Sequence, residues 1–329
     1  MQFNCITDVA FCQDGEQNFL DDQTTHGHRR PWREQKAAAE RLAERYEYID
    51  HDKAERIRDC ASWLKFKKAG GTLKLALANF CRVRLCPVCQ WRRSLKIYGQ
   101  MSRICEALPE EYAIVALNLT LQNCESRNIG TTLDKMLNGF TRMMKYKDVK
   151  KAVHGTYRAT EITVNRNPNS AWYGTLHPHL HTLLVVRKSY FHSAAYISHD
   201  KWVQLWRQAT GVDYDPDVSV YKLKIKEGQN ITDALREVTK YTVKASDLCD
   251  DEIPVDILAD LDQALTKRRF MGLGGILRDL HKKLNLSDIE EDGDLMHVGD
   301  DADELTEEQK QEIYYVWRSG VYVEWDGES

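Results

Sequence analysis

The spacing of apolar and polar residues predicts a run of alternating strands and helices through the middle of the chain. Segments rich in β-branched and aromatic residues predict strands, and segments whose apolar residues recur every three or four positions predict helices. The predicted elements are, in chain order, a strand at 112–121, a helix at 132–146, strands at 154–164 and 176–187, a helix at 198–210, a strand at 218–225 and a helix at 232–248. The first six follow the order of the split βαβ, ferredoxin-like arrangement, in which helices cover one face of an antiparallel sheet. The other face is then free for a substrate.

The regions on either side of this core have different compositions. Residues 34–66 have helical composition, and the apolar run at 313–325 predicts one strand or a hairpin. Residues 288–308 are acidic and contain few apolar side chains, which is typical of a linker or mobile loop. We therefore expect an α+β protein with a helical N-terminal region (1–59), a cysteine-rich module (60–105), a core (106–250) and a C-terminal region (251–329) with an acidic linker or loop at about 287–309.

Charge is distributed unevenly along the chain. The formal net charge is −4, yet residues 61–105 contain ten Lys and Arg residues and neither Asp nor Glu. A segment of this kind is typical of a surface that binds nucleic-acid phosphates. The sequence also lacks an export signal and an apolar run of about eighteen residues, the length that a membrane span requires. We expect a cytoplasmic, DNA-binding protein that makes no contact with a membrane.

Cysteines at metal-ligand spacing lie within the basic segment. Cys81, Cys86 and Cys89 form a Cys-x4-Cys-x2-Cys pattern, and Cys60 is the nearest upstream residue that could complete a tetrahedral Zn²⁺ site. Cys105 and Cys124 compete with Cys60 as the fourth ligand, and buried free thiols are the alternative to a metal. A zinc-bound loop would present four arginines to DNA phosphates: Arg82, Arg84, Arg92 and Arg93. Residues 267–269, Lys-Arg-Arg, are a further candidate for DNA binding.

Three histidines alternate at the start of the predicted strand 176–187. Alternate side chains share one face of a strand, so His177, His179 and His181 should point the same way. Glu161, on the preceding strand, can lie opposite them if the two strands form a hairpin, and His177 competes with Glu161 as the third ligand. A mixed imidazole and carboxylate set suits Mn²⁺ or Mg²⁺ and would also accept Zn²⁺ or Ni²⁺. A lone histidine on a sheet is usually only a hydrogen-bonded polar residue, but three on one face favour metal binding.

The predicted helix 232–248 carries a candidate nucleophile. Glu237, Tyr241 and Lys244 fall on one helical face because they are four and three residues apart. A phenol near a cation and a metal-polarised phosphate can attack a phosphodiester. The simpler interpretation is a core tyrosine beside a surface ion pair. Four other tyrosines are rival nucleophiles: Tyr157, Tyr173, Tyr196 and Tyr214.

Together these motifs resemble the HUH endonucleases, and in particular the single-tyrosine initiators of plasmid rolling-circle replication. YAIVALNLT resembles the first motif of the family, HPHLHTLLV the metal motif and EVTKYTVK the nucleophile motif. CRVRLCPVCQWRRS is similar to the cysteine-rich stretch that precedes the nuclease core in this plasmid group, so the resemblance covers residues 60–248. Conjugative relaxases of the superfamily place the tyrosine before the histidines, and here Tyr241 follows them.

The resemblance implies a mechanism and a set of partners. Tyr241 would nick one strand of the plasmid double-strand origin at a single-stranded region, keep the 5′ end as a phosphotyrosine and release a 3′-hydroxyl primer. Glu237 would activate water for the terminating cleavage. A host helicase and a polymerase would then act at the nick. The alternatives are a zinc-dependent DNA-binding regulator without nuclease activity, and an HUH transposase, some of which use two tyrosines.

Overall fold

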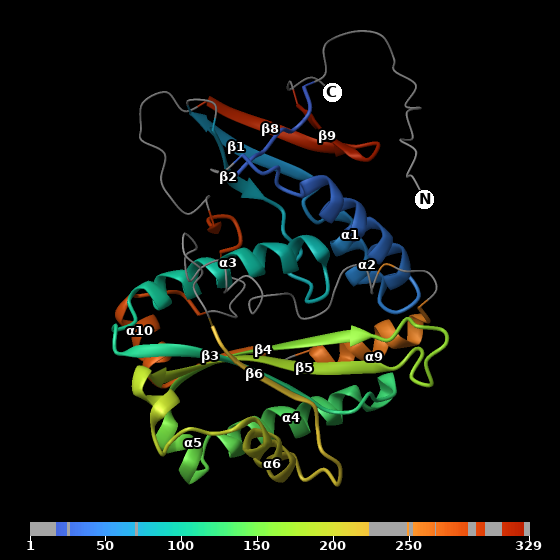
Figure 1. The fold of residues 1–329 in the computed structure, drawn as a ribbon. Coiled ribbons are helices and arrows are strands. Elements are labelled where there is room, and N and C mark those ends of the chain that lie inside the picture. The colour runs from blue at the N-terminus through green and yellow to red at the C-terminus, as the bar shows by residue number, and fades with distance from the viewer. Residues whose placement is uncertain are drawn as a thin grey trace.

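The computed structural model contains two antiparallel sheets stacked above one another, with helices between and beneath them (Figure 1). It describes residues 18–24, 27–69, 72–223, 249, 253–266, 268–288, 294–299 and 311–325. The predicted helix 232–248, the end of the predicted strand 218–225 and most of the acidic segment lie outside these residues. Within the described part of the chain, no helix has the length and apolar character needed to cross a membrane.

The larger sheet has five strands in the order β6-β3-β5-β4-β7. These strands are β3 (Tyr112–Thr120), β4 (Val153–Val164), β5 (Leu176–Arg187), β6 (Val218–Lys222) and β7 (Met271–Gly274). The first four strands in chain order, β3 to β6, have the strand order and antiparallel pairing of a ferredoxin-like sheet, as the sequence predicts. The predicted α+β class is therefore confirmed, and β7 adds an edge strand that the sequence did not indicate.

Helices cover the lower face of this sheet, as predicted (Figure 1). They are α4 (Ile129–Met143), α5 (Lys147–Ala152) and α6 (His199–Thr210). Ser198 caps α6 by accepting a hydrogen bond from the backbone N–H of Lys201. Large side chains of α4 and α6 pack against alternate residues of the strands and form one core cluster: Phe140, Met143, Trp202, Trp206, Leu117, Leu180 and Leu184.

Among the residues that the structure describes, two helices cover one end of the opposite face of the five-stranded sheet. α3 (Pro87–Glu106) and α10 (Gly275–Lys283) belong to the same core cluster as Leu183 and Val185 of β5. Gly275 is required where α10 meets β4, since its φ is +54° and a Cβ atom would lie 2.1 Å from the His154 carbonyl oxygen. The histidine end of β5 is half-exposed. Within the described part of the chain, the expected free face is therefore reduced to that end.

The smaller sheet has four strands in the order β2-β1-β8-β9. Its strands are β1 (Trp63–Ala69), β2 (Thr72–Ala78), β8 (Gln311–Arg318) and β9 (Val321–Glu324). The expectation of helix as far as residue 66 is wrong beyond residue 59, because β1 already begins at Trp63. Its alternation of buried Leu64 and Phe66 with more exposed lysines suits a sheet with one covered face.

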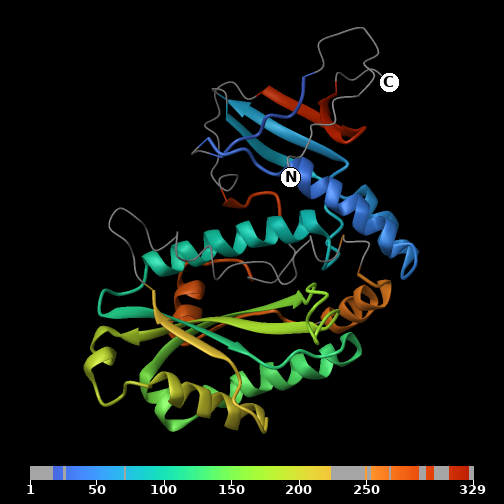
Figure 2. The same ribbon diagram turned by 45° about the vertical axis from the view of Figure 1, so that its right-hand side comes forward.

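Two N-terminal helices precede this sheet, α1 (Trp32–Tyr46) and α2 (His51–Asp59), as the helical composition predicts. α1 packs against one face of the four-stranded sheet and against α3 (Figure 2). Trp32 makes edge contacts with Phe66 of β1 and Trp91 of α3, at centroid distances of 6.2 and 4.7 Å. The N-terminal helices, the cysteine region and one face of the five-stranded sheet therefore share one hydrophobic core.

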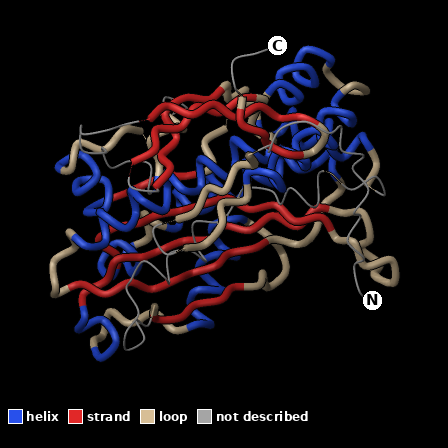
Figure 3. The backbone as a smooth tube through the Cα atoms, turned by 90° about the horizontal axis from the view of Figure 1, so that it is seen from above, coloured by secondary structure: helices blue, strands red, loops and turns tan. Residues whose placement is uncertain are grey.

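Segments from the C-terminal part of the chain complete structures formed by earlier parts. β7 pairs with β4, while the β8–β9 hairpin pairs with β1 at the top of the molecule (Figure 1). Figure 3 shows the strands in red and the helices in blue from above. The hairpin option at 313–325 is thus confirmed, with positive φ at Ser319 and Gly320 in its turn. α9 (Val255–Leu265) packs against α4, and two short 3-10 helices, η1 (Ser126–Asn128) and η2 (Lys188–His192), complete the described elements.

Candidate metal centres

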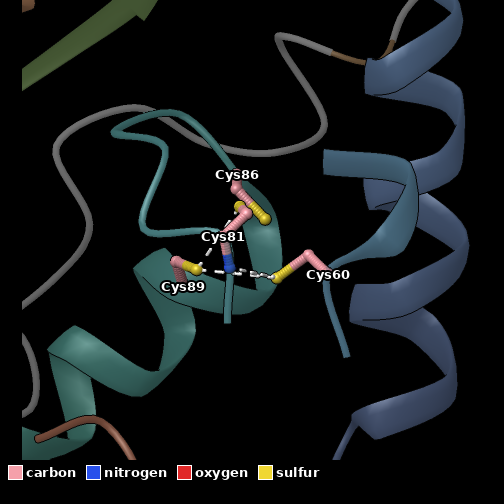
Figure 4. Close-up of side chains that lie close together, drawn as sticks. All are labelled: Cys60, Cys81, Cys86 and Cys89. Carbon is pink, nitrogen blue, oxygen red and sulfur yellow. Dashed lines mark hydrogen bonds between the residues drawn. The ribbon is translucent and has the colours of Figure 1, made fainter. Parts of the chain in front are cut away.

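Four cysteines from three separate segments meet where α2, the end of β2 and α3 come together (Figure 4). Cys60 follows the last turn of α2, and Cys81 lies in the loop after β2. Cys86 is the N-cap residue of α3, and Cys89 lies in its first turn. The four sulfur atoms all lie within 4.8 Å of one another. Cys60, which the sequence predicted from its position, is therefore the fourth cysteine of the cluster.

The geometry of the cysteine cluster suits a tetrahedral thiolate site. The Sγ atom of Cys89 lies 3.6 Å from that of Cys60 and 3.7 Å from that of Cys81. Zinc–sulfur bonds of about 2.3 Å at tetrahedral angles place neighbouring sulfur atoms about 3.8 Å apart. The cluster can therefore hold a metal ion such as Zn²⁺ with little movement of its sulfur atoms.

Backbone N–H groups point at the sulfur atoms. Cys81 donates to Sγ of Cys60 at 3.4 Å, and Arg82 donates to Sγ of Cys89 at 3.3 Å. The residues after two of the cysteines, Ala61 and Arg82, have φ values of +54° and +60°, which turn the chain around the cluster. Such N–H donors stabilise thiolates and fix their orientation, as outer-shell groups do around bound metals.

Neighbouring thiols and burial make the free Cys60 thiol a poor acid. The hydrogen bonds of Cys60 with the other three thiols, together with burial, raise the pKa of Cys60 well above its usual range. A bound divalent ion would reverse this effect by favouring the thiolates. The N-terminus of α3 adds positive potential at Cys86 and Cys89. Lys36 is 1% exposed, and burial lowers its pKa. The nearby Cys60 and Cys86 act in the opposite direction and raise that pKa.

The remaining cysteines of the described chain lie apart from the cluster. Cys105, at the far end of α3, has its pKa raised by burial to about 12. Cys124 pairs through its backbone with Leu176, and Cys249 donates from its thiol to the Ala38 carbonyl at 3.1 Å. Cys105 and Cys124 are therefore excluded as the fourth ligand, since the sulfur of Cys60 occupies that position.

Three of the four arginines expected at DNA phosphates make contacts within the protein. Arg92 is completely buried, donates to the Leu295 and Met296 carbonyls and lies over the Trp32 and Trp91 rings. The expectation that Arg92 faces DNA is therefore wrong, because its guanidinium cross-links α3 to the C-terminal segment. Arg84 lies over the Phe270 ring, and Arg93 donates to the carbonyl of Arg82 at 3.0 Å. Arg82 itself is exposed.

The three histidines lie on the sheet face opposite α4 and α6. β5 places Leu180 and Leu184 among these helices, so the odd-numbered His177, His179 and His181 face the other way. The ring centroids of His177 and His179 are 4.2 Å apart, and those of His179 and His181 are 6.0 Å apart with nearly parallel planes. The three rings therefore form a row along the half-exposed end of β5.

Glu161 joins this row from β4. It lies opposite His179 in the register, and its Oε2 is 2.6 Å from Nε2 of His181. Nδ1 of His181 is 3.1 Å from Oδ1 of Asn118 on β3, a residue that sequence reasoning missed. Two ligands on a shared ion are about 3.0 Å apart when both bonds are about 2.1 Å long and perpendicular. Glu161 and His181 are thus near ligand separation.

The histidine–glutamate set is more open than the cysteine cluster. Among the described residues, only the four cysteines bring three or more potential ligand atoms all within 4.8 Å of one another. An ion held by His179, His181 and Glu161 would require His179, whose ring is stacked 6.0 Å from that of His181, to move closer. His177 is the other candidate, 4.2 Å from His179.

Burial favours the neutral form of His177 and His179, which is the form that binds metals. Burial lowers the pKa of His179 from 6.5 to about 4, and the neighbouring His177 lowers it further while Glu161 opposes this. Burial also lowers the pKa of His177. Asp217, which precedes β6, partly opposes the lowering of both pKa values through its negative charge. No sequence signal pointed to this residue.

The predicted nucleophile helix lies outside the described residues, so Tyr241, Glu237, Lys244 and Lys267 are not placed. The rival tyrosines are described. Tyr157 is fully buried, which removes it as a nucleophile for DNA. Tyr173 and Tyr196 are exposed, and the hydroxyl of Tyr214 accepts from the backbone N–H of Gln122 at 3.0 Å. Gln122 is the residue after Leu121, whose backbone contacts His177, so Tyr214 lies near the histidine row.

Comparison with known proteins gives long matches. A family model described as "Replication protein" (Rep_1) matches residues 72–323. The chain is 35% identical to "Protein rep" of Bacillus amyloliquefaciens, over 94% of this chain and 98% of the relative. It is 37% identical to "Protein rep" of Lactiplantibacillus plantarum, over 93% and 96% of the two chains. It is 32% identical to "Protein rep" of Streptococcus pneumoniae, over 93% and 95%. No solved structure matches the chain significantly.

We expect replacement of one cluster cysteine to release bound zinc. Cys89→Ser should abolish stoichiometric zinc and lower the thermal midpoint, because three segments lose their common ligand. The matched control is Cys105→Ser, a buried cysteine outside the cluster, which should keep its zinc. The metal is measured by mass spectrometry of protein purified without chelator. Equal zinc contents in the two variants would contradict a zinc site at these cysteines.

The depressed pKa of His179 predicts a loss of stability in acid for the metal-free protein. Between pH 6.5 and about 4 the unfolded chain binds a proton that folded His179 does not, so the free energy of unfolding falls as pH falls. His179→Gln should remove on the order of 2 kcal/mol of the loss between pH 7.5 and pH 5. Urea unfolding at the two pH values measures it. An identical pH dependence in the variant would show that His179 titrates normally.

Proposed function

Because the chain belongs to the replication protein family of plasmid Rep initiators, we propose that it starts replication by nicking one strand of the plasmid origin. The observation that supports this most directly is the row of histidines with Glu161 on the sheet face opposite α4 and α6. A nuclease needs a metal site that DNA can reach, and this end of the five-stranded sheet is half-exposed. The proposal includes DNA binding as the first step.

We assign the metal positions to His179, His181 and Glu161, with His177 as the competing ligand. A divalent ion bound there, Mn²⁺ or Mg²⁺, would polarise the scissile phosphate. Glu161 supplies the oxygen ligand that such ions prefer, and the histidines supply nitrogen. Asn118 holds the His181 ring in orientation from the other side.

Tyr241 is the proposed nucleophile. Its phenolic oxygen bonds to phosphorus, the bond from phosphorus to the 3′ oxygen breaks, and the phenolic proton passes to solvent while the leaving oxygen becomes a 3′-hydroxyl. The nicked strand keeps its 5′ end on the protein as a phosphotyrosine. Lys244 would favour the attacking phenolate by charge, since it follows Tyr241 by three residues in the predicted helix 232–248.

Glu237 and the two products account for the rest of the replication cycle. Glu237 would take a proton from water, which would hydrolyse the regenerated nick site to a 3′-hydroxyl and a 5′-phosphate. That new 3′-hydroxyl would attack the phosphotyrosine, the bond from phosphorus to the tyrosine oxygen would break, and the rejoined strand and the protein would separate. The free 3′-hydroxyl is the substrate form that a polymerase extends, and a helicase would separate the strands ahead of it. The cysteine cluster, with Zn²⁺, would hold α3 and the exposed Arg82 in place beside the DNA.

Two other functions fit parts of the molecule less well. A zinc-dependent DNA-binding regulator would use the cysteine cluster and would leave the histidine row without a role. An HUH transposase would share the order of the motifs, but the relatives that match along most of this chain are replication proteins. Nicking activity separates the initiator from the regulator.

We expect Tyr241→Phe to abolish nicking and the covalent adduct while DNA binding persists, because only the attacking oxygen is lost. Tyr214→Phe is the control, since this described tyrosine lies near the histidine row. Conversion of supercoiled origin plasmid to open circles with Mn²⁺ measures nicking, and a gel shift of labelled oligonucleotide measures the adduct. Adduct formation by Tyr241→Phe, or its loss in Tyr214→Phe, would contradict the assignment.

Glu237→Ala should nick at a normal rate but terminate poorly. The first cleavage needs only the phenol, whereas the terminating cleavage needs a base for water. Two-origin plasmids, in which termination at the second site releases a short circle, report the ratio of the two steps. A normal yield of released circles would remove the proposed role of Glu237.

A further inference from the structure

The two faces of the four-stranded sheet have different surroundings. Its inner face packs on α1, where the Phe66 ring contacts Trp32 and Tyr315. Strand alternation therefore turns Trp63, Lys65 and Lys67 of β1 to the outer face, together with Tyr314 and Val316 of β8. In Figures 1 and 2 the described helices lie on the inner side of this sheet.

Aromatic rings on the outer face surround a shallow hollow. Trp63, Tyr314, Val316 and Trp325 line a cavity of about 320 Å³. The register places Trp63 beside Val316, and the backbone N–H of Trp325 donates to the Tyr314 carbonyl at 2.8 Å. The Tyr314 and Trp325 rings meet edge to face, with centroids 6.0 Å apart, and Trp325 is 41% exposed. These rings thus present apolar surface to solvent at one place.

Lysines lie beside these rings. Nζ of Lys65 is 5.2 Å from the centre of the Tyr314 ring and 2.7 Å from Glu312. Lys67 is exposed, and the register places it between Lys74 of β2 and Glu312 of β8. We define the aromatic–lysine face by eight outer-face residues: Trp63, Lys65, Lys67, Lys74, Glu312, Tyr314, Val316 and Trp325.

We propose that the aromatic–lysine face binds single-stranded DNA, with bases stacked on Tyr314, Trp325 and Trp63 and phosphates beside Lys67 and Lys74. Aromatic platforms flanked by cations are the general means of binding single strands without sequence preference. Duplex DNA keeps its bases stacked on one another, so it cannot place them on these rings. Three lysines against Glu312 give the face a net positive charge, which suits phosphates better than an apolar protein partner.

This inference rests on the proposed function, because nicking and strand displacement produce the single strand that the face would bind. The face is distinct from the histidine row. The two sites belong to different sheets, and α3 lies in the layer between them (Figure 1). The aromatic–lysine face would therefore hold a part of the strand away from the scissile phosphate and leave the chemistry unchanged.

The experiment compares variants that keep apolar bulk but differ in aromatic character. Binding of the full-length protein to a fluorescein-labelled oligothymidine is followed by anisotropy at several salt concentrations. Tyr314→Leu with Trp325→Leu should weaken binding about tenfold or more, and Tyr314→Phe should bind normally because stacking is kept. Lys67→Gln should lower the log–log salt slope by about 0.7. Tyr48→Ala, which removes an aromatic ring that is 82% exposed after α1, is the control and should bind normally.

A second measurement keeps the test independent of folding. Ultraviolet cross-linking of wild-type protein to an oligonucleotide containing 5-iododeoxyuridine, followed by peptide mapping, should place cross-links at Trp63, Tyr314 or Trp325. Unchanged affinity of the double leucine variant, or cross-links confined to other segments, would overturn the inference. An equal loss of duplex binding would also overturn it. Failure of the proposed function would be distinguishable, since wild-type protein would then not nick origin plasmid.

Discussion

Along the whole length of β5, antiparallel pairing with β4 decides which side chains face which layer. The register sets Glu161 opposite His179 and brings its carboxylate to His181. A slip of one residue would turn the three histidines into the core of Leu180, Leu184, Trp202 and Trp206, and would expose those leucines instead. The buried contacts of this strand with α4 and α6 therefore hold the imidazoles in place. The site and the core are specified by the same pattern.

The cysteine cluster performs a similar task at the junction of the two sheets. It joins the end of α2, the loop after β2 and the start of α3, and α3 is the layer that separates the small sheet from the large one. The buried guanidinium of Arg92 continues this connection to residues 295 and 296. The basic segment that would suggest a DNA surface thus serves partly as the internal framework of the molecule.

Much of the larger sheet can be predicted from the sequence because its signals are local. The bounds of β5 agree with the prediction, since a strand buried against helices needs a long apolar run with regular alternation. Cys60 was found by its distance in the sequence from the other cysteines. The pairing of β1 with β8 could not be found in this way, because the partner strand lies far along the chain and the lysines of β1 resemble a helix surface. Arg92 was misjudged for the same reason, since only tertiary contacts show that it is buried.

Both sheets contain strands from the C-terminal part of the chain, and this has a consequence for biosynthesis. β7 and the β8–β9 hairpin are made last, yet β7 closes an edge of the five-stranded sheet and β8 occupies a central position in the four-stranded one. Contacts between residues so distant in sequence form slowly and only after the ribosome has released most of the polypeptide. An incomplete translation product would lack half of the upper sheet. In such a fragment the edge of β1 would be unpaired and its backbone N–H and C=O groups would be exposed. Proteases would then be expected to degrade the fragment before it could bind DNA.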